Sequence, residues 1–271
     1  MEKLSWENLI QSMATSYDPK QHLKAKVDSY NASRGALDLL DCPKCLNRGN
    51  FAHCREDNTI VFSDCSCMKT RSAIQRMERS GLKQSIRDYT FDKFNATEPW
   101  QKDLKEGTMA YAKNPQGWLI ICGQSGCGKT HLCTAICRER LLQQEDVHYM
   151  SWREDITRLK ALSPDNPERE KLLKRLKTVQ LLYIDDLFKT GADDKARGKP
   201  TAADVNLAFE ILNYRYINYL NTVLSTELHM QDLLDVDEAT GGRIAERASK
   251  HIYSVKSARS RNYRLRDMAV L

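Results

Sequence analysis

Gly123-Gln124-Ser125-Gly126-Cys127-Gly128-Lys129-Thr130 is the stretch of the chain that decides the fold. It matches the phosphate-loop pattern G-x-x-x-x-G-K-[ST], and it lies between an apolar run, 118–122, and a helical pattern, 129–144, as this pattern requires. Three glycines let the backbone wrap with its N–H groups pointing inward, and such a nest at a helix N-terminus binds anions. We expect Lys129 to neutralise the β- and γ-phosphates of ATP and Thr130 to ligate Mg²⁺. A glycine-rich turn without a ligand is the alternative.

The second half of such a site is an apolar strand that ends in carboxylates, and residues 181–186 supply it. We expect Asp185, at the strand end, to hold Mg²⁺ through water. Asp186 is then placed to orient or deprotonate the water that attacks the γ-phosphate. An aspartate pair after apolar residues is by itself more often a strand end or a helix cap. Its position downstream of a phosphate loop favours the catalytic interpretation.

Outward from these two motifs, short apolar runs alternate with longer helical patterns. Strands are expected at 118–122, 147–150, 181–184, 222–224 and 252–255. Helices are expected at 129–144, 168–177, 202–219 and 236–249. Strands that are apolar on both faces and alternate with helices predict an α/β fold with a mostly parallel, five-stranded sheet covered by helices.

The composition excludes several other classes of protein. The chain has 271 residues, of which 41% are hydrophobic, so it can build a core and is not disordered throughout. This length predicts one medium domain and a small one. No apolar run approaches the ~20 residues that a membrane helix needs, and the first residues have no signal-peptide core. We therefore expect a cytoplasmic protein with no membrane partner.

Charge is distributed unevenly along the chain. The formal net charge is 42 − 36 = +6. Between Arg243 and Arg266 there are eight basic residues and a single acid, Glu246. A surface that faces phosphates and a solvated face without function are equally consistent with charge alone. The eight are Arg243, Arg247, Lys250, Lys256, Arg259, Arg261, Arg264 and Arg266.

Nine cysteines in a cytoplasmic protein indicate metal ligation or burial rather than disulfides. Two close pairs are Cys42-Pro43-Lys44-Cys45 and Cys65-Ser66-Cys67. Four thiolates on two turns fit a tetrahedral Zn²⁺ site, with Cys54 and His53 as rival ligands. Buried free thiols and an iron–sulfur cluster are the alternatives. The remaining cysteines without ligand spacing, expected to be core or incidental, are Cys122, Cys127, Cys133 and Cys137.

The N-terminal part differs in character from the rest. Residues 1–40 have an amphipathic helical pattern, and 68–87 again look helical. The expected organisation is a small helical, zinc-binding domain over 1–88 and an ATPase domain over 89–271.

Several further motifs carry a family resemblance. They are Thr90-Phe91-x-x-Phe94, residues 117–123, Gly128-Lys129-Thr130-His131-Leu132, residues 183–188, Leu224-Ser225-Thr226-Glu227, and Gly242-Arg243-Ile244-Ala245-Glu246-Arg247. With them the chain resembles the AAA+ ATPases, specifically the bacterial and phage replicative helicase loaders related to the replication initiator. The resemblance covers about 89–263. It implies a core without the helical C-terminal lid of typical AAA+ proteins, and weak ATPase activity before assembly.

The resemblance also implies roles for single residues. Ser225 or Thr226 takes the place of the sensor of the γ-phosphate, although Glu227 stands where many relatives have Asn. Arg243 or Arg247 supplies the arginine finger to a neighbouring subunit, with Arg247 slightly favoured. Contacts with ATP are expected from Gly123, Gln124, Ser125, Gly126, Cys127, Gly128, Lys129, Thr130, His131 and Thr226. The polar stretch 189–200 is expected either to touch single-stranded DNA through Lys189, Lys195, Arg197 and Lys199 or to be a solvated loop. The aromatic residues of the helix after it (Phe209, Tyr214, Tyr216 and Tyr219) are expected in the core.

The function implied is an ATP-dependent loader of the replicative DNA helicase. The zinc module would grip a hexameric helicase, and self-associated ATPase domains would hold single-stranded DNA until hydrolysis. A transposition helper ATPase that assembles on double-stranded DNA is the alternative, although such helpers usually lack a cysteine module. A third possibility is a DNA-binding switch that uses ATP only for assembly.

Overall fold

The computed structural model describes residues 18–77, 85–190 and 199–265 of the chain. The chain divides into two compact units between Arg71 and Ser72. No helix within these described ranges is long and apolar enough to cross a membrane.

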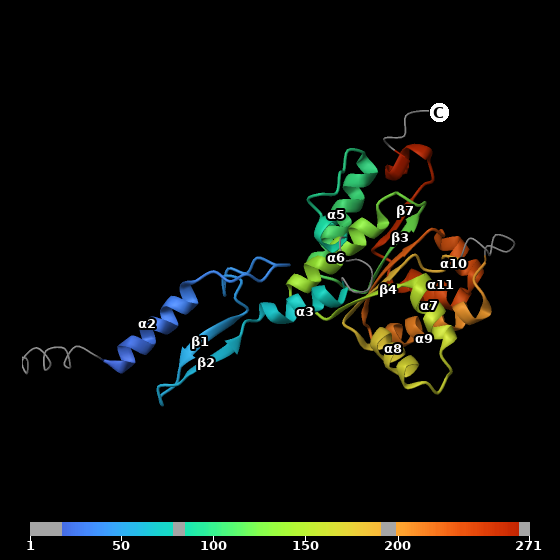
Figure 1. Ribbon diagram of the computed structural model, residues 1–271. Helices are drawn as coiled ribbons and strands as arrows, with labels where there is room; N and C mark the ends of the chain where they lie inside the picture. Colours follow the sequence, from blue (N-terminus) through green and yellow to red (C-terminus); the bar gives the residue numbers. More distant parts are fainter. Residues whose placement is uncertain (1–17, 78–84, 191–198, 266–271) are drawn as a thin grey trace, which may run out of the picture. The chain divides into compact units, whose positions relative to one another are not determined.

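The larger unit is built on a five-stranded sheet in which every neighbouring pair is parallel. Its strands, in the order β4-β5-β6-β3-β7, are β4 (Val147–Ser151), β5 (Leu181–Asp185), β6 (Asn221–Thr226), β3 (Trp118–Gly123) and β7 (Ile252–Val255). Strand β3, which has a neighbour on each side, is buried at all of its positions because helices cover both faces of the sheet (Figure 1). All five expected strands are present, and the α/β fold class is confirmed.

The helices of the larger unit agree in part with expectation. They are α4 (Ser85–Asp88), α5 (Pro99–Lys113), α6 (Lys129–Leu142), α7 (Trp152–Ala161), α8 (Pro167–Thr178), α9 (Ala202–Ile217), α10 (Met230–Val236) and α11 (Glu238–Arg247). The expected helix at 236–249 is wrong at its start because Val236 ends α10. A new helix then begins at Glu238, capped by Asp237, whose carboxylate accepts the N–H of Thr240 at 2.8 Å. Helices α5, α7 and α10 were not expected.

One buried charged side chain joins a helix end to a strand of this unit. Arg215 on α9 has no exposed surface. Its guanidinium donates to the hydroxyl of Thr222 at the start of β6 and to four carbonyls. These carbonyls belong to Leu176, Lys177, Val179 and Asn221. Arg215 therefore ties the C-terminal end of α8 to the start of β6, beneath the sheet.

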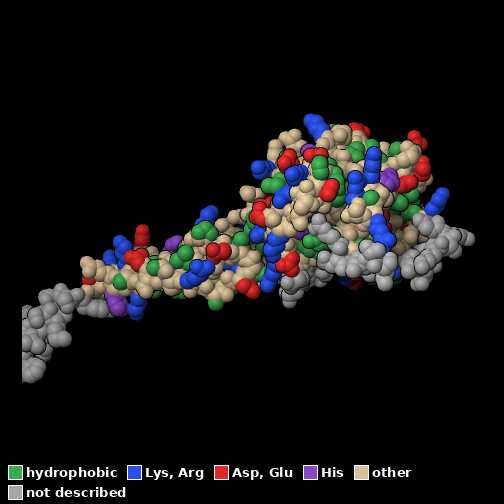
Figure 2. Space-filling view, turned by 90° about the horizontal axis from the view of Figure 1, so that it is seen from above, with side chains coloured by type: hydrophobic (Ala, Val, Ile, Leu, Met, Phe, Trp, Pro, Cys, Tyr) green, Lys and Arg blue, Asp and Glu red, His purple; other side chains and the backbone are tan. Residues whose placement is uncertain are grey.

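Over residues 18–71 the smaller unit consists of a helix, a hairpin and the first residues of α3 (Cys67–Met77). Helix α2 (Pro19–Ala32) is followed by a turn-rich stretch and by β1 (Asn50–Cys54) and β2 (Ile60–Asp64), which pair antiparallel. Both signs of charge are interspersed over the visible face of this unit (Figure 2).

The expected N-terminal helices are only partly correct. Over 33–40 the expectation of helix is wrong, because the N–H of Gly35 donates to Leu46 and a side chain at Gly35 would collide with Asn47. Residues 1–17 lie outside the described residues. The helical pattern at 68–87 corresponds to α3 (Cys67–Met77) and α4, and residues 78–84 are not described.

Candidate nucleotide site and cysteine cluster

The phosphate loop joins β3 to α6, as its motif requires. Gly126 and Gly128 adopt φ values of +79° and +97°, which side chains other than glycine rarely accept. A Cβ atom at Gly128 would also lie 2.7 Å from the ring of Phe94. The ammonium of Lys129, the first residue of α6, donates to the carbonyls of Gly123 (2.8 Å) and Gln124 (3.0 Å).

A pocket of about 330 Å³ opens beside this loop. Ser125, Gly126, Gly128, Lys129, Thr130 and His131 line one side. Asp186, Lys189 and Glu227, from the ends of β5 and β6, also line it. The carboxyl ends of neighbouring parallel strands meet at one edge of the sheet, where ligands of such folds bind. Phosphate-loop residues and carboxylates therefore share one cavity.

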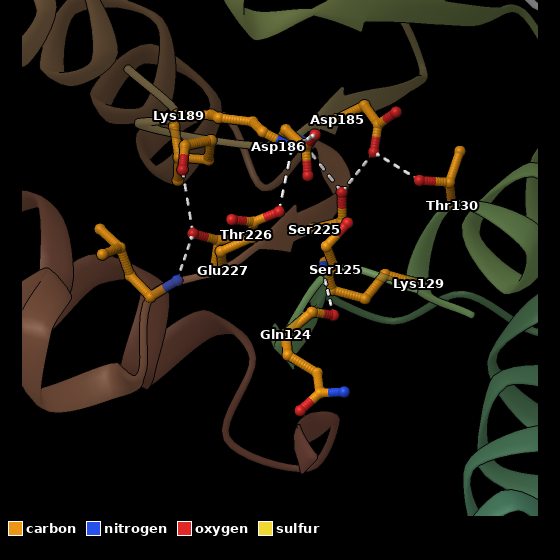
Figure 3. Close-up of polar contacts among 12 residues, drawn as sticks. Gln124, Ser125, Lys129, Thr130, Asp185, Asp186, Lys189, Ser225, Thr226 and Glu227 are labelled. Carbon is orange, nitrogen blue, oxygen red and sulfur yellow. Dashed lines mark hydrogen bonds and ion pairs between the residues drawn. The ribbon is translucent and has the colours of Figure 1, made fainter. Parts of the chain in front are cut away.

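Asp185 lies at the centre of a network of hydroxyls. Its Oδ1 accepts from Ser225 (2.5 Å), Tyr183 (2.5 Å) and Thr130 (3.2 Å), and its Oδ2 accepts from Tyr149 (3.3 Å) (Figure 3). Burial, followed by the Asp185 charge, raises the pKa of Tyr183, so this hydroxyl stays a donor. The contact between Thr130 and Asp185 places two hard oxygen ligands together, and this donor set fits Mg²⁺.

The second aspartate makes a different set of contacts. Asp186 has φ +55°, and its N–H donates to the hydroxyl of Ser225 at 3.0 Å. Its Oδ2 accepts from the ammonium of Lys189 at 2.8 Å, and the same ammonium donates to Oε1 of Glu227 at 3.0 Å. Burial lowers the pKa of Lys189, but the two carboxylates outweigh burial and leave this pKa raised. The ammonium is therefore charged at neutral pH.

Neither of the two expected sensor residues lines the pocket. Ser225 and Thr226 are both fully buried. The hydroxyl of Thr226 donates to the carbonyl of Leu187 (2.9 Å) and accepts the N–H of Leu228 (3.1 Å), so it holds the loop after β5. Glu227, one residue further, is the residue of this motif that lines the cavity. Alternation along the extended strand puts Thr226 and Glu227 on opposite faces, and the bonds of Ser225 to Asp185 and to the N–H of Asp186 occupy its hydroxyl.

Aromatic residues before the phosphate loop form another part of the pocket wall. The Nε2–H of His131 donates to the carbonyl of Thr90 (2.8 Å), and its ring stacks on Tyr89 with centroids 4.7 Å apart. Phe94 meets the same ring edge-on at 5.2 Å. Burial lowers the pKa of His131, which keeps the ring neutral. The Thr90-Phe91-x-x-Phe94 motif marked this segment without indicating that it lines the cavity.

The C-terminal segment also reaches the phosphate loop, which the sequence did not indicate. The side chain of Gln124 donates to the carbonyl of Ala258 (2.8 Å) and accepts its N–H (2.7 Å). The N–H of Tyr263 donates to Gly126 (2.9 Å), and Arg264 donates to the hydroxyl of Ser125 (3.0 Å). Arg264 therefore lines the nucleotide pocket.

The two candidate arginine fingers lie on α11 against aromatic rings of the α9 region. The guanidinium of Arg243 lies over Phe209 (4.9 Å) and Tyr216 (5.4 Å), and that of Arg247 lies over Tyr219 (4.6 Å). The expectation that these aromatic residues belong to the core is wrong for Tyr214 and Tyr219, which are 37% and 75% exposed, whereas Tyr216 packs against the core and Phe209 is half-buried. Both arginines are half-buried against these rings.

Of the candidate DNA-contacting residues, Lys189 is paired inside the pocket as above, and Lys199 is exposed. Lys195 and Arg197 lie outside the described residues.

The four cysteines of the two pairs converge in the smaller unit. The Sγ atoms of Cys42, Cys45, Cys65 and Cys67 all lie within 4.8 Å of one another, and all four residues are buried. Cys42 and Cys65 are 3.8 Å apart at sulfur, and Cys45 and Cys67 are 3.6 Å apart. A tetrahedron with Zn–S bonds of about 2.3 Å has S···S edges of about 3.8 Å, so these spacings fit Zn²⁺.

The surroundings of the cluster shift the pKa values of two of its thiols in opposite directions: the pKa of Cys45 is lowered, whereas burial raises the pKa of Cys67 to about 12. Burial raises the pKa of Cys45, but the N–H of Gly49 and the neighbouring thiols outweigh burial and lower this pKa to about 7. The buried guanidinium of Arg71 also interacts with Cys67, and its positive charge would offset a tetrathiolate centre. The rival ligands lie elsewhere: Cys54 is exposed, and Nε2 of His53 is bonded to Ser63. The other four cysteines are buried in the larger unit, as expected.

Residues 59–269 match the family of IstB-like ATP binding proteins. The chain belongs to this family. An IstB-like identity agrees with the fold, with the phosphate loop and with the helicase-loader resemblance of the motifs. The chain is a P-loop ATPase of AAA+ type.

The relatives include a protein of a phage-like element, a protein of an insertion sequence and a replicative helicase loader. The chain is 34% identical over 230 residues to protein XkdC of the phage-like element PBSX of Bacillus subtilis (strain 168), which covers 80% of this chain and 83% of that protein. It is 26% identical over 151 residues to the ATP-binding protein of insertion sequence IS232 of Bacillus thuringiensis subsp. berliner, covering 55% and 56%. It is 27% identical over 113 residues to the replicative helicase loader DnaC of Escherichia coli (strain K12), covering 40% and 46%.

Among solved structures, the crystal structure of DnaI has the same fold. It matches with a TM-score of 0.52 at 21% identity, over 64% of this chain and 92% of that one.

Proposed function

We propose that this protein is an ATP-dependent loader of the replicative DNA helicase onto single-stranded DNA. The observation that carries the proposal is the buried four-cysteine cluster in a unit of its own, joined to an IstB-like ATPase. Over its described residues, 18–71, the unit has few buried apolar side chains apart from these cysteines, so a metal would stabilise it. A small unit of this kind, once held by a metal, would suit docking to another protein. We assign helicase docking to residues 1–88 and ATP hydrolysis to residues 89–271.

The pocket supports a conventional hydrolysis mechanism. Lys129 would leave the two loop carbonyls and bind the β- and γ-phosphates, while Thr130 and Asp185 would hold Mg²⁺, which neutralises phosphate charge. Asp186 would accept a proton from water as the oxygen of this water bonds to the γ-phosphorus. The bond from the γ-phosphorus to the bridging oxygen then breaks, and ADP leaves with that electron pair.

Assembly would complete the site. Arg247 or Arg243 would reach the γ-phosphate in a neighbouring subunit, and the aromatic rings beneath both arginines would keep their guanidinium groups at the surface. Single-stranded DNA would be held inside such an assembly by basic residues of the 189–200 stretch, of which Lys199 is exposed. The proposed place of action is the cytoplasm.

A second candidate is a transposition helper ATPase that assembles on double-stranded DNA. The similarity to the IS232 protein and the IstB-like family favour it. The cysteine cluster favours the loader, because a loader needs a unit that docks to the hexameric helicase and the cysteine-bearing unit would serve as that docking unit.

The two candidates differ in the DNA that stimulates hydrolysis and in what is delivered. ATP hydrolysis by the full chain would be measured with single-stranded circles and with relaxed duplex circles, with and without the replicative helicase of the same cell. A loader is expected to transfer the helicase to single-stranded circles, detected as strand displacement of an annealed oligonucleotide. Stimulation by duplex alone, with no transfer of helicase, would contradict the loader and favour the helper.

A further inference from the structure

Lys189 stands out among the basic residues of the nucleotide pocket. It follows β5 by a few residues, and its ammonium bridges Asp186 and Glu227, the carboxylates at the ends of β5 and β6. In Figure 3 the two aspartates lie between Thr130 on one side and Lys189 on the other. Lys189 therefore faces the phosphate-loop residues across the same cavity.

The charges of this cluster do not balance. Two carboxylates and one ammonium leave a net charge of −1 on a wall where a triphosphate has to bind. Asp186 is also engaged at Oδ2, which accepts from Lys189, so a water molecule would have to share this oxygen with the ammonium or bind Oδ1. A γ-phosphate that entered the cavity would attract the ammonium more strongly than a single carboxylate does, since it carries more charge.

The two bonds of Lys189 have different consequences. If the ammonium left Asp186 for a phosphate oxygen, the bond to Glu227 could still hold the lysine at the wall. Ser225 and Thr226 cannot take this part, because both hydroxyls are buried and bonded within the protein. Glu227 occupies the wall position at the end of β6, but its own charge would repel a phosphate.

We propose that Lys189, anchored by Glu227, is the residue that senses the γ-phosphate in this protein. Binding of ATP moves its ammonium from Asp186 to the γ-phosphate and leaves both carboxylate oxygens of Asp186 to water. ADP, which lacks the γ-phosphate, leaves the bond to Asp186 in place. Lys189 is thus a contact for the nucleotide, and Glu227 is a positioning residue. This inference rests on the proposed ATP site.

The test is the ratio of the affinities for ATP and ADP, measured by calorimetry on the full chain with Mg²⁺. Lys189→Ala should lower the affinity for ATP at least about tenfold and change that for ADP little, since a hydrogen bond to a charged group is lost only with ATP. Glu227→Gln should lower the ratio of ATP affinity to ADP affinity by a smaller factor. Lys189→Arg should have a ratio between those of Lys189→Ala and wild type. Equal changes for ATP and ADP would overturn the proposal, because a lysine that only neutralises Asp186 and Glu227 gives that result.

Lys160→Ala is the matched control. The Lys160 side chain is 37% exposed and pairs with Asp204 at 2.8 Å, whereas Lys189 is 39% exposed and pairs with Asp186 at 2.8 Å. Lys160 does not line the nucleotide pocket, so its variant should keep the wild-type ratio. Failure of the wild-type chain to bind either nucleotide would refute the proposed function itself, which separates that failure from an unchanged ratio in Lys189→Ala.

Discussion

Lys129→Ala is the sharpest perturbation of the nucleotide site. In the structure Lys129 is 5% exposed, and its ammonium donates to two carbonyls of the phosphate loop. With ATP bound we expect it to donate to phosphate oxygens instead. A hydrogen bond to a charged partner contributes about 1.5–3 kcal/mol, so one such contact corresponds to about 10–150-fold in affinity.

The same variant should fold normally. Water can enter the space that the lysine side chain leaves beside the pocket and satisfy the carbonyls of Gly123 and Gln124. We therefore expect the free energy of unfolding to change by about 1 kcal/mol or less. Lys177→Ala, which removes an ammonium paired with Glu210 away from the pocket, is the control for loss of charge.

The assay is a calorimetric titration of each variant with ATP in the presence of Mg²⁺. Thermal unfolding of both variants is measured in parallel. An affinity within about twofold of wild type, in a Lys129→Ala protein that is folded, would refute the assignment of the loop to ATP.

Three further predictions concern the metal, the core and pH. Cys45→Ser should release zinc and unfold the smaller unit while ATP binding persists. Cys54→Ser, which changes an exposed thiol outside the cluster, should keep full zinc content. Equal zinc content in both variants would disprove the ligand set. Arg215→Met should lower the free energy of unfolding by about 3–5 kcal/mol, because it leaves buried carbonyls without a hydrogen-bond donor. Arg158→Ala, at an exposed ion pair, should change this free energy by about 0.5 kcal/mol or less. Similar denaturation midpoints for the two variants would contradict this prediction. Burial raises the pKa of Asp155 to about 6, so its stabilising proton is fully bound below about pH 4 and lost as pH rises through about 6. Asp155→Asn should therefore unfold with a weaker pH dependence between these values, and an unchanged slope in denaturant titrations would count against it.

Local chemistry explains what could be predicted from the sequence. The strands and the phosphate loop are encoded by neighbouring residues, since apolar runs and a glycine pattern suffice to specify them. The cysteine pairs likewise predicted their own convergence, although a hairpin lies between them. Helix α7 was not predicted because its few apolar residues lie among charged ones and give a weak helical pattern. Its cap residue is a local signal, but this signal alone did not indicate a helix.

Contacts between distant segments could not be predicted in this way. Arg264 meets Ser125 only because β7 lies beside β3 and returns the chain to the phosphate loop. The bond between Lys189 and Glu227 depends on β5 and β6 being neighbours in the sheet. The charge of Lys189 suggested a DNA contact, and its real partners appear only once the strand order is known.

The central claim is that the cysteine-bearing unit docks a replicative helicase for an ATP-driven loading step. Its most direct test is capture of the purified hexameric helicase of the same cell by the full chain with ATP, before and after removal of metal by a chelator. The account predicts capture that is lost on chelation, regained with zinc and absent in Cys45→Ser but retained in Cys54→Ser. Absence of capture by the zinc-loaded wild-type protein would contradict it.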